Sequence, residues 1–311
     1  MLKVTSIYDT VIYLVMLVLS YLLVDLYQGG DLEAYRNVYE NAARMSFSQV
    51  YRFSLQELGA SEPVYIVFVW VFSKIFSYKV YKLILSFLLI WLLIKFLRQY
   101  LSINGLAKNL LLLLFVSTNY YILALITELE RLCVSFVLIG LYLSNNEKKY
   151  LVLAFGAHLQ TLIIIIAHLA SDFIFKLAKL TLSKQFVAGL FIFLILYFTY
   201  NDLMAQIRTK LYYYFQTSGL TIDNVLLVVL VFPVFVRNLR IFLTLVFISC
   251  AGIIVGFDRI TVVILFSMIF YIVQMNLNFS RRALLLTLSI GMSTKGFVFI
   301  SNFLEYGRGY G

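Results

Sequence analysis

Long apolar runs separated by short polar stretches cover most of the chain. A membrane-spanning helix needs about 20 mostly apolar residues. Runs of this kind, three of them short, occupy residues 8–27, 64–76, 80–97, 108–126, 132–144, 150–171, 186–200, 224–236, 239–256, 259–276 and 282–303. They are apolar on all sides, whereas strands of a membrane barrel alternate apolar and polar positions over about ten residues. We therefore predict an all-α polytopic membrane protein with roughly 10–11 transmembrane or re-entrant helices.

The polar stretch 28–63 interrupts this pattern and carries five of the 15 carboxylates. Lys3 in a short tail places the N-terminus inside and this loop outside, under the positive-inside rule. The basic stretch 95–108 should again lie inside, but two full spans between the two loops would return it to the outside. We therefore predict that the short run 64–76 is re-entrant or a half-helix lining an outward-facing cavity, where interrupted helices are tolerated.

Composition supports lipid as the solvent. Hydrophobic residues make up 62% of the chain and charged residues 13%, about half the share typical of soluble domains. Two prolines and 15 glycines leave little material for linkers, so we predict a single integral membrane domain over residues 1–311. The net charge of +10 comes from Lys and Arg clusters between apolar runs, as at cytoplasmic helix ends. We expect no nucleic-acid partner.

The outer loop 28–63 contains a short amphipathic helix in this interpretation. Asp31 follows two glycines and is suited to cap a helix over residues 32–42. Helical spacing then places Asp31, Tyr35 and Tyr39 on one face, while Arg36 neighbours Glu33 and Glu40. The segment is either an interfacial helix with its tyrosines at the lipid headgroups or one wall of a polar site.

The sequence Ser61-Glu62-Pro63 indicates a helix start, because proline is favoured in the first turn. Glu62 then stands at the positive end of the helix dipole, at the mouth of an apolar segment. It can be a helix cap, or a base whose pKa is tuned by partial withdrawal from water.

Arg131 begins the apolar run 132–144 and shares a helical face with Glu128 and Ser135. A guanidinium at such a place can bind phosphate in bidentate fashion. The alternative is a residue that reaches the interface and pairs with Glu128.

His158 lies deep within the run 150–171 and has Thr161 on its own face, whereas His168 faces another side. Ionisable residues inside a membrane are costly and are functional candidates by default. A neutral histidine hydrogen-bonded between helices remains the alternative for His158. Arg259, beside Asp258 at the head of the run 259–276, is either a second anion ligand or part of a salt-bridged helix start.

The order of these features resembles a known family. Asp31-x-x-x-Tyr35 in the outer loop, Glu62-Pro63-x-Tyr65 followed by FSKIFSYKVYKLILSF, Arg131 at a helix start, Ala154-x-x-x-His158 and the late pair Arg259-Ile260 appear in succession. This succession is similar to the EpsG-like branch of the Wzy polysaccharide polymerases, and the similarity extends to about residue 270.

The resemblance implies a multi-pass enzyme of the bacterial inner membrane, with its active site facing the periplasm. Such polymerases of O-antigen, capsule or exopolysaccharide transfer a glycan from undecaprenyl pyrophosphate to another lipid-linked repeat unit. The substrate is thus an undecaprenyl-pyrophosphate-linked oligosaccharide in membrane lipid, and a flippase and a chain-length regulator are candidate partners. A GT-C-like architecture follows by analogy.

This chemistry suggests roles for the singled-out residues. Cations that stabilise the leaving pyrophosphate are Arg131, Arg259 and Arg36. The candidate catalytic bases are Glu62 and Asp31 first and His158 next. Tyrosines placed to contact sugar rings are Tyr35, Tyr39 and Tyr65. The sequence has no Asp-x-Asp or other metal motif, so we expect no obligate metal and no cofactor.

Three rival functions remain open. A GT-C-like glycosyltransferase or an O-antigen ligase is the nearest one. A lipid-linked oligosaccharide flippase should show two pseudo-symmetric helix sets, which the sequence does not reveal. A non-catalytic assembly partner would not need Glu62, Arg131, His158 and Arg259 to converge. Convergence of these four side chains is therefore the structural test.

Overall fold

The computed structural model describes residues 7–28, 31–59, 62–101, 106–145, 147–158, 161, 163–164, 166–167, 170–171, 173, 242–248, 262–264, 266–267 and 293–307. Every regular element among these residues is helical. The chain divides into two compact units, Met1–Thr161 with Ile272–Gly311 and Leu162–Tyr271. All helices named below belong to the first unit. The expected single domain stays a prediction, and the predicted runs 186–200 and 224–236 lie outside the described residues.

Within the described ranges, two helices are long and apolar enough to cross a membrane, by length and composition. They are α1 (Ile7–Leu26) and residues Tyr78–Arg98 of α5 (Tyr78–Leu101). At 1.5 Å per residue, the 20 residues of α1 extend about 30 Å, the thickness of a bilayer core. The two helices pack against each other, and α1 leaves Leu14 and Val18 exposed on the other side, as lipid-facing positions do. The prediction of an all-α polytopic membrane protein is confirmed.

The predicted run 108–126 is broken in the structure. It forms α6 (Leu106–Thr118) and α7 (Tyr120–Thr127), bent by 50° at the break, and the pair counts as one further span at most. Asn119 causes the break, because its side chain accepts hydrogen bonds from the backbone N–H groups of Tyr121 and Ile122 and so begins a new helix.

The outer loop forms two helices, α2 (Asp31–Ala42) and α3 (Phe47–Leu58), followed by α4 (Pro63–Ser73). Helix α3 ends at Gly59, whose φ of 58° lies in the left-handed region that favours glycine. The 11 residues of α4 extend about 16 Å, about half the bilayer core. This length fits the predicted half-helix for the run 64–76.

The helix predicted for the run 150–171 is not continuous in the structure. Helix α9 (Lys148–Ala157) ends at His158, whose φ of −158° and ψ of 124° are extended. The position of His158 deep within a continuous helix is therefore wrong. Side-chain hydroxyls hold the freed helix end, since both Ser135 and Thr161 donate to the carbonyl of Ala154, at 2.9 and 3.0 Å. Ser135 belongs to α8 (Glu130–Asn145), which packs on α9.

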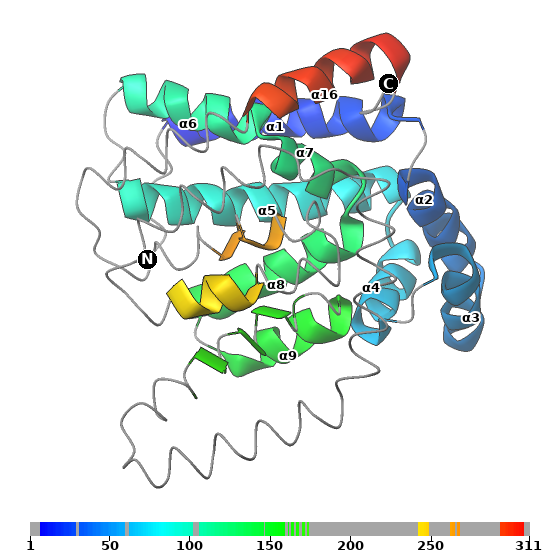
Figure 1. Cartoon of the computed structure of the whole chain (residues 1–311). Helices are drawn as coiled ribbons and strands as arrows, with labels where there is room; N and C mark the ends of the chain where they lie inside the picture. The colour runs from blue at the N-terminus through cyan, green and yellow to red at the C-terminus, as the bar shows by residue number, and fades with distance from the viewer. Residues whose placement is uncertain are drawn as a thin grey trace, which may run out of the picture. The chain divides into compact units, whose positions relative to one another are not determined.

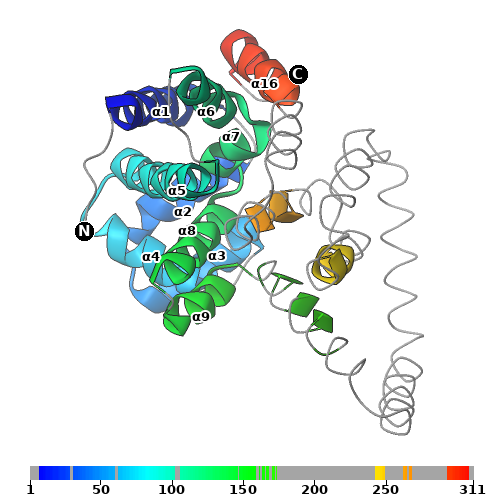
Figure 2. The same ribbon diagram turned by 90° about the vertical axis from the view of Figure 1, so that its left-hand side faces the viewer.

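Figure 1 shows α1, α5, α6 and α8 running roughly alongside one another, with α2, α3 and α4 grouped at one end of these helices. Helix α16 (Ser293–Tyr306) lies beside α6 and α7. The end-on view in Figure 2 separates α1, α5, α8 and α9 into successive rows. Helix α4 packs on α9, α9 packs on α8, and α2 packs beside α4, so α4 lies next to helices that come much later in the sequence.

Candidate functional site

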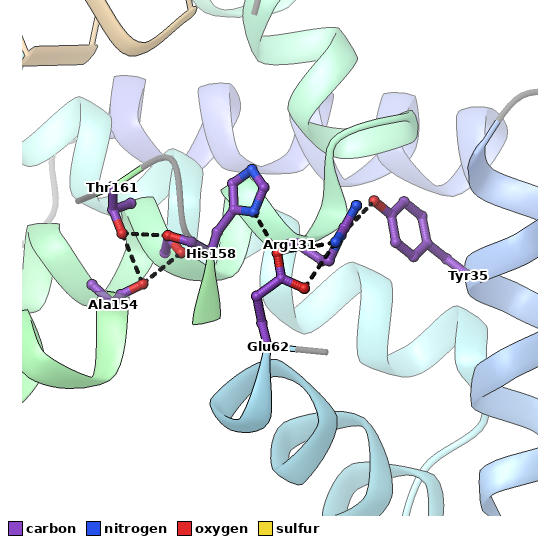
Figure 3. Close-up of polar contacts among 7 residues, drawn as sticks. Tyr35, Glu62, Arg131, Ala154, His158 and Thr161 are labelled. Atoms are coloured by element: carbon purple, nitrogen blue, oxygen red, sulfur yellow. Dashed lines mark hydrogen bonds and ion pairs between the residues drawn. The ribbon is translucent and has the colours of Figure 1, made fainter. Parts of the chain in front are cut away.

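Glu62 occupies the N-cap position of α4, as the Ser-Glu-Pro sequence predicts, and Pro63 is the first helical residue. The side chain of Glu62 makes no capping hydrogen bond to its own helix. It extends instead toward Arg131 and His158, as Figure 3 shows. The carboxylate is thus free to act between helices.

Arg131 lies in the first turn of α8 and contacts two partners. Its Nη1 atom donates to both carboxylate oxygens of Glu62, at 3.0 and 2.8 Å. Its Nε atom donates to the hydroxyl of Tyr35 on α2, at 3.3 Å. The side chains of Arg131 and Glu62 are only 17% and 15% exposed, so water screens the pair weakly.

His158 completes the cluster from the end of α9. Its Nδ1 atom lies 3.1 Å from Oε1 of Glu62. An ionised carboxylate only accepts hydrogen bonds, so the geometry assigns the proton to Nδ1 and leaves Nε2 of a neutral imidazole as an acceptor. The hydroxyl of Thr161 lies 2.6 Å from the backbone carbonyl of His158 and shares its one proton between this carbonyl and that of Ala154.

The contacts of Glu62 decide its protonation. Burial alone would raise its pKa, but the hydrogen bond with His158 and the charge and hydrogen bonds of Arg131 outweigh burial. Together they lower the pKa of Glu62 from 4.5 to about 2, so it is ionised at neutral pH. Burial raises the pKa of Tyr35 to about 12, against the influence of Arg131, so its hydroxyl keeps its proton.

Asp31 stands one turn before Tyr35 on α2, and its side chain is exposed. Its negative charge is close enough to contribute to the raised pKa of Tyr35. The predicted shared face of Asp31, Tyr35 and Tyr39 is thus divided: Tyr35 and Tyr39 are buried, and the carboxylate of Asp31 faces outward.

Three other predicted site residues have hydrogen-bond partners outside this cluster. The Nη2 atom of Arg36 donates to the carbonyl of Val24 at the end of α1, at 2.6 Å, and its guanidinium lies over the ring of Tyr78. The hydroxyl of Tyr39 donates to the carbonyl of Phe76. Tyr65 donates to Glu130, while its ring meets that of Tyr35 edge-on. Arg259 lies outside the described residues.

A second polar cluster was not predicted from the sequence. Glu128 was the predicted partner of Arg131, but Glu128 accepts a hydrogen bond from Tyr27. Glu130 is fully buried, and so is Lys82 of α5, with which it forms an ion pair. The signal was present in the sequence, because Lys82 is an ionisable residue within an apolar run.

The arrangement offers a hydrogen-bond donor for an anion beside a proton acceptor. Within the described part of the chain, Nη2 of Arg131 and Nε2 of His158 make no hydrogen bond, so both are available to a ligand. In the same residues, no three His, Cys, Asp or Glu side chains gather into a group that could hold a metal ion. The chemistry that these side chains support is proton transfer next to a bound anion.

No curated protein and no solved structure matches the chain. A model of the EpsG family matches residues 6–305, all but the two ends of the sequence. The match confirms the resemblance to this family. Separately, the structure joins Glu62, Arg131 and His158 in one cluster. The chain therefore belongs to the EpsG family.

Proposed function

We propose that this protein is a glycan polymerase that joins undecaprenyl-pyrophosphate-linked repeat units at the periplasmic face of the bacterial inner membrane. Membership of the EpsG family supports a polysaccharide polymerase or glycosyltransferase-like role in general. Its apolar helices make it a membrane protein. The observation that carries the proposal is the contact of one carboxylate, Glu62, with both Arg131 and His158.

The reaction forms one glycosidic bond and breaks one. A hydroxyl oxygen of the acceptor sugar attacks the anomeric carbon of the donor sugar, while the bond from this carbon to the pyrophosphate oxygen breaks. The undecaprenyl pyrophosphate leaves with the bonding electrons. The hydroxyl proton passes to a base and then to water. The protein must therefore stabilise the leaving oxyanion and accept one proton.

Arg131 is the group for the leaving oxyanion. Its Nη2 atom makes no hydrogen bond to any residue that the structure describes, and its guanidinium is held on two other edges by Glu62 and Tyr35. A donor held in place before the reaction has no reorganisation cost when negative charge develops on the pyrophosphate. No metal is needed in this scheme.

His158 suits the role of base better than Glu62 does. A carboxylate with a pKa of about 2 is a weak proton acceptor at neutral pH. Glu62 instead orients the imidazole through Nδ1 and stabilises the positive charge that forms when Nε2 takes the proton. In this proposal Asp31, which is exposed one turn before Tyr35, binds a sugar hydroxyl.

The test uses purified protein in lipid nanodiscs with undecaprenyl-pyrophosphate repeat units. A ladder of longer glycans that is lost in Arg131→Ala and Glu62→Ala supports the proposal. A wild-type protein that makes no ladder, under conditions where another polymerase does, contradicts it. Transfer only to a lipid acceptor of another kind indicates a ligase, and movement of the lipid across the bilayer without a new glycosidic bond indicates a flippase.

A further inference from the structure

Glu130, the first residue of α8, has a fully buried carboxylate with three partners. Oε1 accepts from the hydroxyl of Tyr65, at 2.9 Å, and Oε2 accepts from that of Tyr78, also at 2.9 Å. The ammonium of Lys82 lies 3.1 Å from Oε2 and is equally buried. One carboxylate thus joins helices α4, α5 and α8.

This cluster around Glu130 is adjacent to the Glu62–Arg131 pair in two separate segments of the sequence. Glu130 directly precedes Arg131, and Tyr65 stands about one turn after Glu62 on α4. The contact between Tyr65 and Glu130 therefore spans the same two helix ends as the contact between Glu62 and Arg131. A shift of α4 along α8 would have to break both contacts at once.

We propose that Glu130 and Lys82 are positioning residues that set the distance of Glu62 and His158 from Arg131. This inference rests on the proposed function, in which these three side chains act on the substrate. Charged hydrogen bonds are short and directional, so they fix helix ends more closely than apolar contacts. Such accuracy matters, because a displacement of about 1 Å in a catalytic group can cost roughly 100-fold in rate.

Stability alone does not explain a buried ion pair at this place. Removing two charges from water is costly, and apolar residues of similar volume often give equal or greater stability. The Nζ atom of Lys82 makes no directed hydrogen bond in the described residues, so its contact with Glu130 is an ion pair by distance. An apolar replacement would fill the same space without fixing the carboxylate of Glu130.

The decisive variant is Lys82→Met combined with Glu130→Gln, which removes both charges and keeps an oxygen for one tyrosine hydroxyl. We expect it to fold with an unfolding temperature close to that of the wild type, because no single charge is left buried. The rate constant kcat for polymerisation should fall about 10- to 100-fold with little change in KM, since the substrate contacts remain.

A second readout is independent of catalysis. The sequence has two histidines, so His168→Gln leaves His158 as the only source of an imidazole ¹⁵N signal. The Nδ1 shift of His158 reports its hydrogen bond to Glu62. In the double variant this signal should move toward that of Glu62→Gln. Should the protein make no polymer at all, this measurement still decides the positioning role.

Asp9→Asn is the matched control. Asp9 pairs with Arg98, which lies about 24 Å from Lys82 along α5, so this variant loses an ion pair between helices far from the cluster. It should leave the His158 signal unchanged. If the double variant does not insert, Tyr65→Phe takes its place, with a smaller shift of the same signal expected. An unchanged Nδ1 signal in the variant that folds overturns the proposal.

Discussion

Glu62 and Arg131 lie 69 positions apart in the sequence, yet one guanidinium nitrogen donates to both oxygens of the carboxylate. The pair joins the first residue before α4 to the first turn of α8. Both side chains are mostly buried, so removing either one leaves the other charge in a poorly hydrated place. The two residues nevertheless have different expected roles, and their variants should fail in different ways.

Arg131→Lys should lose most polymerase activity. Lysine keeps the positive charge but cannot hold Glu62 and Tyr35 while offering a further N–H to the pyrophosphate. We expect a fall in kcat of about 100-fold or more for Arg131→Lys and Arg131→Ala alike, measured as the initial rate of glycan extension.

Arg52→Ala is the control for these variants, since Arg52 lies exposed on α3. It should retain the wild-type rate. Near-normal extension by Arg131→Lys would show that charge alone suffices, contrary to the role given to the planar guanidinium.

Acid should weaken the wild type through Glu62. Its pKa is about 2 in the folded protein against an ordinary 4.5, so its ionised form stabilises the fold above about pH 4.5. This stabilisation is lost as the pH falls from about 4.5 toward 2. Glu62→Gln should therefore unfold at a lower temperature than the wild type at pH 7, and the difference should shrink toward about pH 3.

Thermal unfolding in detergent across this pH range measures the effect. Glu40→Gln, which changes an exposed carboxylate on α2, should differ from the wild type by a small and nearly constant amount. A gap between the wild type and Glu62→Gln that stays constant from pH 7 to about pH 3 would contradict the lowered pKa of Glu62.

His158→Gln should reduce the rate of the chemical step. Glutamine can still donate a hydrogen bond to Glu62, but it cannot accept the proton of the sugar hydroxyl. Loss of a general base typically costs about 10²- to 10⁴-fold in rate, so kcat should fall in that range while KM changes little. His168→Gln provides the comparison and should stay close to the wild type. Equal losses in the two variants would remove His158 from the proposed mechanism.

The sequence predicted the class of fold well, because long apolar runs reflect a lipid solvent. It predicted the continuity of helices less well. Asn119 and His158 each interrupt an apolar run that reads as one helix. At Asn119 the side chain competes with the backbone for hydrogen bonds, and at His158 hydroxyls from other positions hold the helix end. Neighbours brought by folding decide such breaks, and hydrophobicity does not record them.

The residues of the candidate site could be predicted from the sequence, but their partners could not. Glu62, Arg131 and His158 were each recognisable, since a charged or titratable side chain beside an apolar run is costly without a partner. The identity of the partners was not, because Arg131 had a carboxylate at Glu128 within helical reach and yet pairs with Glu62. Helix packing over 69 positions settles that choice, and local spacing contains no information about it.

The substitution Gly296→Ala, at a position far from the candidate site, should destabilise the protein. A Cβ atom at Gly296 of α16 would overlap the backbone carbonyl of Thr118, at the break between α6 and α7. Gly140→Ala on α8 is the matched comparison, because its Cβ would meet the side-chain end of Leu92, which can move. Alanine favours a helix by the same amount at both positions, about 1 kcal/mol, so the difference isolates the overlap. We expect Gly296→Ala to lose about 3 kcal/mol relative to Gly140→Ala, seen as a lower unfolding temperature, since backbone atoms cannot yield as a side chain can. Equal unfolding temperatures for the two variants would show that α16 can withdraw from the break without loss.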